Sequence, residues 1–156
     1  MTDPLINLKG ITKSYTRGAQ RVPIFERLDM NIPVQDFVAI MGPSGSGKTT
    51  LLNLLGGIDR PSSGEIVFDG KRMDNLDEGK LAAFRAGNIG FIFQFYNLMP
   101  MLTAAQNVEL PLLLTNQGAK ARRDRAATAL QIVGLSDRAG HKPSELSGGQ
   151  QQRVGL

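Results

Sequence analysis

A glycine-rich stretch, Gly42–Thr49, constrains this chain more than any other feature of its sequence. It reads Gly-Pro-Ser-Gly-Ser-Gly-Lys-Thr and fits the spacing Gly-x-x-x-x-Gly-Lys-Ser/Thr, in which glycines let the backbone wrap a phosphate. The preceding run Phe37–Met41 is short, apolar and rich in strand-forming residues, and Thr50–Leu55 has helical character. The motif therefore predicts a strand, a tight loop and a helix whose N-terminus faces a polyphosphate.

The residue types in this loop indicate which part each could play. Backbone N–H groups would converge on the phosphates, Lys48 would reach the β- and γ-phosphates, and the Thr49 hydroxyl would hold Mg²⁺. The alternative is a glycine-rich turn that binds nothing, but three glycines and a lysine at these offsets rarely coincide with both flanking patterns. The candidate phosphate-binding residues here are Gly42, Ser44, Gly45, Ser46, Gly47, Lys48, Thr49 and Thr50.

A second motif lies near the other end, at Leu146–Arg153. Ser147 is a suitable helix cap, and Gly148 and Gly149 permit the close approach of a ligand. Alone, such a cluster is usually an ordinary turn. Together with the upstream loop it indicates a second phosphate-contacting element.

With these two motifs in this order, the chain resembles the nucleotide-binding domain of ABC transporters over nearly its whole length. The likeness is strongest to the group that includes macrolide exporters and lipoprotein-release ATPases. It rests on Lys13–Tyr15, Gly42–Thr50, Leu55–Glu65, Ile89–Leu98, Leu102–Pro111 and Leu146–Gln150.

The resemblance implies further roles. Tyr15 matches the aromatic residue that stacks on adenine, although a packed or half-exposed tyrosine is the alternative. Gln94 matches the glutamine that contacts Mg²⁺ and the attacking water, so Lys48 and Gln94 are the catalytic candidates, and Thr49 and Gln94 the metal ligands; an ordinary strand-end glutamine is the alternative. Ser147, Gly148, Gly149 and Gln150 match residues at the γ-phosphate of an opposite subunit.

The partners that the resemblance implies are a second ATP-binding domain in a head-to-tail dimer and a transmembrane permease subunit. The family pattern continues with a strand ending in aspartate, a glutamate and a switch histidine, whereas this chain ends at Leu156 and its single histidine, His141, precedes the second motif. We therefore expect ATP binding with little or no hydrolysis from these residues alone, and a loop position in solvent for His141.

The expected fold class is α/β, a P-loop NTPase of the ABC type that is incomplete, with an antiparallel β-subdomain and a helical subdomain. One domain would span 1–156: a β-subdomain and core at about 1–94, a helical subdomain at about 95–146, and the signature at 146–153. The elements expected are antiparallel strands up to Ile32, a strand at Ile66–Gly70, a short helix at Leu76–Phe84, a buried strand at Ile89–Phe93, and helices from Asn97 to Lys142 with breaks at Pro100, Pro111 and Gly118.

Charge leaves one competing interpretation. The formal net charge is +4 and the densest basic cluster is Lys120–Arg125, which could suggest nucleic acid. The following residues repeat apolar positions at helical spacing, so the arginines are most simply a solvated helix face, and we expect no nucleic-acid partner. No segment approaches the roughly 20 apolar residues of a membrane helix. We therefore expect a cytoplasmic protein, held at the inner face of the cell membrane by its partner.

The run Phe95–Leu102 is rich in aromatic and methionine side chains. It could form an apolar groove for a helix of the permease, or fill the junction between subdomains, and both interpretations stay open. The alternative function is an ATP-gated non-transport regulator of a membrane or cell-wall complex, or a hydrolysis-deficient fragment. A GTPase is disfavoured because the sequence contains no Asn-Lys-x-Asp for guanine recognition.

Overall fold

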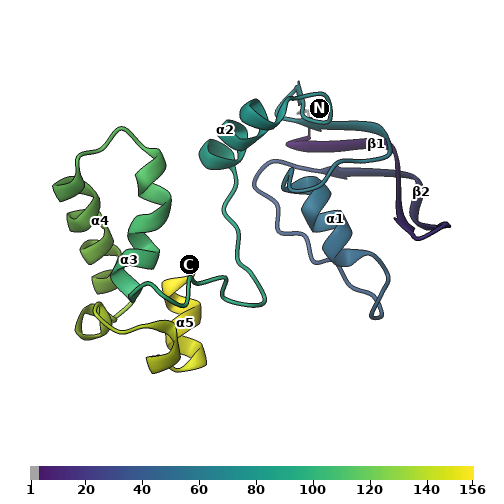
Figure 1. The fold of residues 1–156 in the computed structure, drawn as a ribbon. Coiled ribbons are helices and arrows are strands. Elements are labelled where there is room, and N and C mark those ends of the chain that lie inside the picture. The colour runs from purple at the N-terminus through teal and green to yellow at the C-terminus, as the bar shows by residue number, and fades with distance from the viewer. Residues whose placement is uncertain (1–3) are drawn as a thin grey trace. The chain divides into compact units, whose positions relative to one another are not determined.

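The computed structural model describes residues 4–156. The chain divides into two compact units, one ending at Gly90 and the other formed by Phe91–Leu156. The first contains the strands with two helices, and the second is helical (Figure 1). Each unit is built around its own apolar core.

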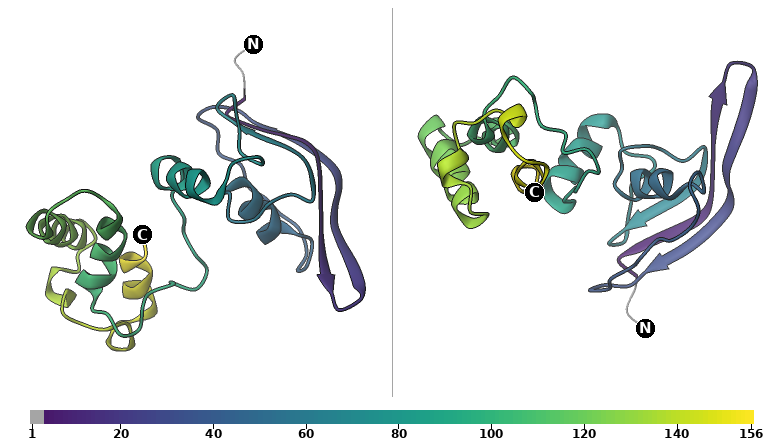
Figure 2. Two further views of the ribbon diagram at one scale, coloured as in Figure 1. Left: turned by 45° about the horizontal axis from the view of Figure 1, so that its top comes forward. Right: turned by 90° about the horizontal axis from the view of Figure 1, so that it is seen from below.

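A four-stranded antiparallel sheet forms the first unit, in the order β2-β1-β3-β4. Its two long strands make a hairpin, which Figure 2 shows as an extended ribbon, and Arg17 faces Gln20 beside the turn. The antiparallel strands expected in the opening portion and around Ile66 are thus confirmed. The strands are β1 (Ile6–Arg17), β2 (Gln20–Ile32), β3 (Ser63–Phe68) and β4 (Lys71–Arg72).

An irregularity in β1 lets two apolar residues reach the same core. Strict alternation would place Leu8 and Ile11 on opposite faces of the sheet. The pairing register with β2 shifts between them, at Gly10, whose φ is +57°. Both side chains are consequently buried, at 1% and 0% exposure.

Two helices pack in this unit, α1 (Lys48–Leu55) and α2 (Glu78–Asn88). Asp77 caps α2 by accepting a hydrogen bond from the Lys80 N–H at 2.8 Å. Both helices occur where the sequence predicts helical segments. The core that joins them to the sheet consists of Leu8, Ile11, Leu51, Leu54, Leu55, Ile66, Met73 and Leu81.

Two of the predicted strands are wrong. Phe37–Met41 lies outside the sheet, and Phe37 and Met41 are 92% and 88% exposed. Ile89–Phe93 is also irregular, with Ile92 71% exposed. An apolar run becomes a buried strand only if other segments pair with it and cover its faces, and within residues 4–156 neither run has a strand partner.

The helical unit follows the predicted pattern from Ala104 onward, whereas residues 97–103, predicted to be helical, are irregular. Thr103 begins α3 with a capping box, in which its hydroxyl accepts from the Gln106 N–H and the Gln106 side chain accepts from the Thr103 N–H. The core consists of Ala104, Leu130, Leu135, Leu146 and Val154. The α-helices are α3 (Ala104–Glu109), α4 (Ala119–Ile132) and α5 (Gly148–Val154). Three short 3₁₀ helices lie among them, η1 (Leu110–Leu114), η2 (Ser136–Arg138) and η3 (Pro143–Glu145).

Within residues 4–156, every helix is too short or too polar to cross a bilayer.

Candidate functional site

The glycine-rich loop leads directly into α1. Gly45 and Gly47 have φ values of +81° and +89°, a region of backbone space that favours glycine. Gly47 is the N-cap of α1, and its carbonyl accepts the first helical hydrogen bond from the Leu51 N–H at 2.8 Å. The first backbone N–H groups of α1 therefore point back toward the loop.

Lys48 places its ammonium group inside this loop. Its Nζ donates hydrogen bonds to the carbonyls of Gly42 and Pro43, at 2.8 and 2.7 Å. The charge adds to the partial positive charge at the N-terminus of α1. The loop and helix end thus form one electropositive concavity, as anion sites at helix N-termini do.

A pocket of about 360 Å³ opens at this place. It takes in the second half of the loop and the first turn of α1, together with one apolar side chain from β2. Thr49 and Thr50 contribute the hydroxyl oxygens that follow the lysine. The lining residues are Ile24, Ser44, Gly45, Gly47, Lys48, Thr49 and Thr50.

Tyr15, the predicted adenine-stacking residue, belongs to the same unit and lies on β1. Its side chain is 40% exposed, and its hydroxyl donates to Asp59 Oδ2 at 2.6 Å. The hydrogen bond to Asp59 and the burial of the phenol raise the pKa of Tyr15.

The remaining predicted site residues belong to the second unit. Gln94 is exposed in an irregular segment. Ser147 caps α5: its hydroxyl accepts from the Gln150 N–H at 3.3 Å, and its N–H donates to the Gln150 side chain at 2.8 Å. A Cβ on Gly148 would stand 2.8 Å from the Tyr96 hydroxyl. The structure therefore groups the predicted residues into two sets, the loop with Tyr15 and the signature with Gln94.

Sequence reasoning missed the part played by Asp59 and Lys13. Lys13 is only 7% exposed and donates to Asp59 Oδ1 and to the Arg60 carbonyl, both at 2.7 Å. The spacing of Lys13 and Tyr15 on a strand was the available signal, because residues two apart share one face of a sheet. Asp59 is 44 residues beyond Tyr15 in sequence, so only the fold shows their contact.

Three other expectations concern the helical unit. His141 was predicted in solvent, but it is half-buried, with Nε2 3.2 Å from Arg138 Nη1. The basic cluster is a solvated face of α4 as predicted, apart from Arg122, which is half-buried and donates to Glu109 at 3.3 Å. In the apolar run, Phe95 and Met101 are 76% and 78% exposed, and Leu98 packs on the core.

Comparison with known proteins decides the family. The family model described as ABC transporter matches residues 25–156. The chain belongs to the ABC transporter family. A macrolide export ATP-binding/permease protein of Aeromonas hydrophila is 49% identical over 156 residues, which is 100% of this chain and 24% of that protein. An uncharacterized ABC transporter ATP-binding protein of Methanocaldococcus jannaschii, MJ0796, is 46% identical. The match covers 97% of this chain and 66% of that protein.

Solved structures agree with this assignment. A dimeric post-hydrolysis state of the MJ0796 cassette bound to ADP and Pi matches with a TM-score of 0.86 and 44% identity, over 96% of this chain and 66% of that one. A second dimeric structure of the same cassette also gives 0.86, at 45% identity. The α/β fold of an ABC ATPase is thereby confirmed. The chain spans about a quarter of the length of the macrolide-export relatives that it matches.

Proposed function

We propose that this chain binds ATP with Mg²⁺ at the loop Gly42–Thr50 and acts as the ATP-binding part of an ABC transporter. The observation that carries the proposal is the position of the Lys48 ammonium. It lies inside a loop whose glycines adopt the left-handed backbone conformation, at the N-terminus of α1. A lysine there places a positive charge where a polyphosphate would meet converging N–H groups. The family to which the chain belongs supports the same site.

The residues fit a triphosphate. Lys48 donates to two loop carbonyls, and both hydrogen bonds can be exchanged for bonds to phosphate oxygens, which are charge-assisted and stronger. The pocket volume of about 360 Å³ lies within the usual range for small-molecule sites. Tyr15, which lies in the same compact unit as the loop, would provide a flat apolar surface for the base.

The donor set also fits Mg²⁺ that arrives with the nucleotide. Within residues 4–156, no group of three or more His, Asp or Glu side chains could hold a metal alone. Mg²⁺ usually keeps several waters and takes few protein ligands beside the phosphates. Thr49, exposed on the first turn of α1, would supply a hydroxyl ligand, and Gln94 is proposed as a second ligand from the family pattern alone. The bound cation would neutralise charge on the phosphates.

Dimerisation and a membrane partner complete the proposal. The MJ0796 cassette is described as dimeric, and we infer that two copies of this domain pair head to tail, with Ser147, Gly148, Gly149 and Gln150 facing the nucleotide of the opposite copy. The macrolide-export relatives are ATP-binding/permease proteins. A transmembrane permease that exports a substrate or releases lipoprotein is therefore the proposed partner, with this chain at the inner face of the cell membrane.

The Lys48→Ala variant tests the nucleotide site. We expect the affinity for MgATP, measured by titration calorimetry, to fall at least about tenfold, since hydrogen bonds from a charged group to phosphate contribute about 1.5–3 kcal/mol. The matched control is Lys80→Ala, which removes a lysine that is 72% exposed and paired with Asp77, and which should bind as the parent does. Circular dichroism would confirm that both variants fold. Unchanged affinity in Lys48→Ala would refute the assignment of this loop.

A further inference from the structure

We propose that Asp59, together with Lys13, is a positioning residue that holds Tyr15 in place to receive the base of the nucleotide. This inference rests on the ATP site proposed above and adds a determinant of base recognition to it. Asp59 itself would not contact the nucleotide. It would act through the orientation of the Tyr15 ring.

The geometry fixes the tyrosine at two points. Asp59 accepts the Tyr15 hydroxyl at 2.6 Å with Oδ2 and the Lys13 ammonium at 2.7 Å with Oδ1. The same ammonium lies 4.7 Å from the centroid of the Tyr15 ring, within the range of a cation–π contact. One ring face and the hydroxyl are thus engaged, while 40% of the residue stays exposed.

The protonation states make this arrangement stable at neutral pH. Burial would raise the pKa of Asp59, but the hydrogen bonds from Lys13 and Tyr15 outweigh it, and the pKa is lowered. Asp59 is therefore an anion that accepts two hydrogen bonds. The pKa of Tyr15 is raised, chiefly by its hydrogen bond to Asp59, so its hydroxyl keeps the proton that it donates.

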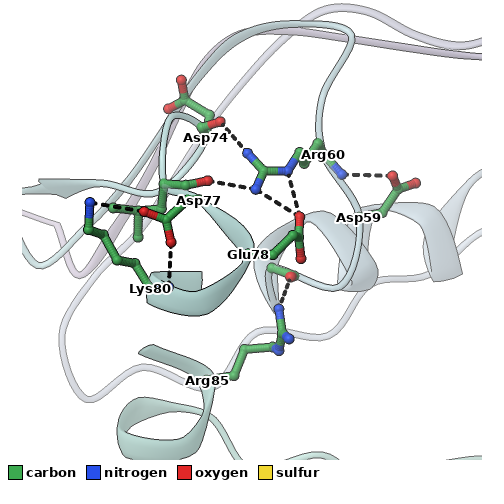
Figure 3. A network of polar contacts seen from close by, with 9 residues as sticks. Asp59, Arg60, Asp74, Asp77, Glu78, Lys80 and Arg85 are labelled. Carbon is green, nitrogen blue, oxygen red and sulfur yellow. Dashed lines mark hydrogen bonds and ion pairs between the residues drawn. The ribbon is translucent and has the colours of Figure 1, made fainter. Parts of the chain in front are cut away.

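Asp59 is itself held rigidly by its neighbour Arg60 (Figure 3). The Arg60 N–H donates to Asp59 Oδ1 at 2.7 Å, and the Arg60 carbonyl accepts from Lys13. The Arg60 guanidinium donates to the Leu76 carbonyl at 2.6 Å and to Glu78 Oε1 at 2.8 Å, which anchors it at the start of α2. The Asp59 carboxylate that orients Tyr15 is therefore held by a backbone N–H group of a residue whose own side chain is anchored.

A ring that is ordered beforehand loses less conformational freedom when the base stacks on it. The charge of Lys13 on one ring face is a further constraint, because it favours stacking of the base on the other face. Loss of Asp59 would release both the hydroxyl and the ammonium. The base would lose affinity, whereas the triphosphate, which binds through the Lys48 loop, would not.

The test compares ATP with inorganic triphosphate, which has no base, each with Mg²⁺. In Asp59→Asn we expect the affinity for ATP to fall about three- to tenfold, a part of the full contribution of base stacking, and the affinity for triphosphate to stay within about twofold. The control Asp124→Asn removes the same charge from the exposed face of α4 and should change neither affinity. Tyr15→Phe, which keeps the ring, should reproduce the selective loss without altering the charge.

Fluorescence reports separately whether Asp59 holds the Tyr15 hydroxyl in solution. The chain has two tyrosines and no tryptophan, so in a Tyr96→Phe background Tyr15 is the only strong emitter. A carboxylate that accepts the phenol hydrogen bond quenches tyrosine emission, and we expect Asp59→Asn to increase it.

The outcomes separate this inference from the proposed function. An equal fall of both affinities in folded Asp59→Asn, no change in either, or unaltered Tyr15 emission would each overturn the positioning role. If the parent protein bound neither ATP nor triphosphate, or if Lys48→Ala bound both as the parent does, the nucleotide site itself would be refuted. If Asp59→Asn fails to fold, Tyr15→Phe takes its place. The comparison of its affinities for ATP and triphosphate then decides whether the positioning role holds.

Discussion

Gly47 lies so close to Phe25 that a Cβ added to Gly47 would stand 2.9 Å from Cζ of the ring. The same added atom would be 2.8 Å from Cγ2 of Ile24. Both neighbours come from β2, so the last glycine of the loop is where the candidate site touches the sheet. The loop needs glycine there both for its backbone angle and for this close packing.

Gly47→Ala is therefore expected to damage stability and binding together. Left-handed strain and overpacking each cost about 1–3 kcal/mol, so we expect the free energy of unfolding to fall by at least about 1 kcal/mol in urea titrations. Gly45→Ala is the matched control for stability, because Gly45 has a similar φ but open space around it. Equal losses in the two variants would show that contact with Phe25 and Ile24 is unimportant.

Two leucines on α1 test how the helix is held on the sheet. Leu54 is fully buried, whereas Leu52 is 56% exposed. Leu54→Ala should lower the free energy of unfolding by about 2–5 kcal/mol, through lost burial and a cavity. Leu52→Ala, the same change on the same helix, should cost well under about 1 kcal/mol. Similar losses in urea unfolding would contradict the orientation of α1.

Arg60 is expected to hold the start of α2. Its guanidinium donates to the carbonyls of Asp74 and Leu76 and to Glu78. Arg60→Met keeps the aliphatic stem and should reduce stability by about 1–3 kcal/mol, since it leaves backbone acceptors unpaired. Hydrogen exchange should show faster opening of α2. Lys80→Met, which removes an exposed ion pair with Asp77, should produce little change, and a comparable effect in both variants would count against the special role of Arg60.

The lowered pKa of Asp74 predicts that the protein loses stability in acid. Burial would raise its pKa, but hydrogen bonds from Arg72 and from the Ile66 N–H outweigh it and lower the pKa below its ordinary value of 3.8. A carboxylate whose pKa is lower in the folded protein than in the unfolded chain stabilises the fold. Its contribution is fully present at pH values above the unfolded-state pKa and is lost as the pH falls through the folded-state pKa.

Unfolding monitored between neutral pH and pH 2 should therefore show stability falling below about pH 4. In Asp74→Asn the protein should be less stable at neutral pH and its acid dependence shallower. The same slope in parent and variant would show that Asp74 does not contribute.

Local sequence signals predicted much of this protein because the interactions behind them span only a few residues. The glycines of the loop, the threonine cap of α3 and the serine cap of α5 each act within about four positions, so helix starts and turns could be located. The hairpin of β1 and β2 is likewise local, since its strands are joined by a short turn.

The sequence by itself determined the family, the two motifs and the order of helices and antiparallel strands. Only the tertiary structure decided that Phe37–Met41 and Ile89–Phe93 are irregular, because a strand exists through its neighbours and not through its own composition. Likewise, only the fold brings Asp59 to Tyr15, 44 residues away. Contacts between distant segments depend on how the core closes, which no local pattern records.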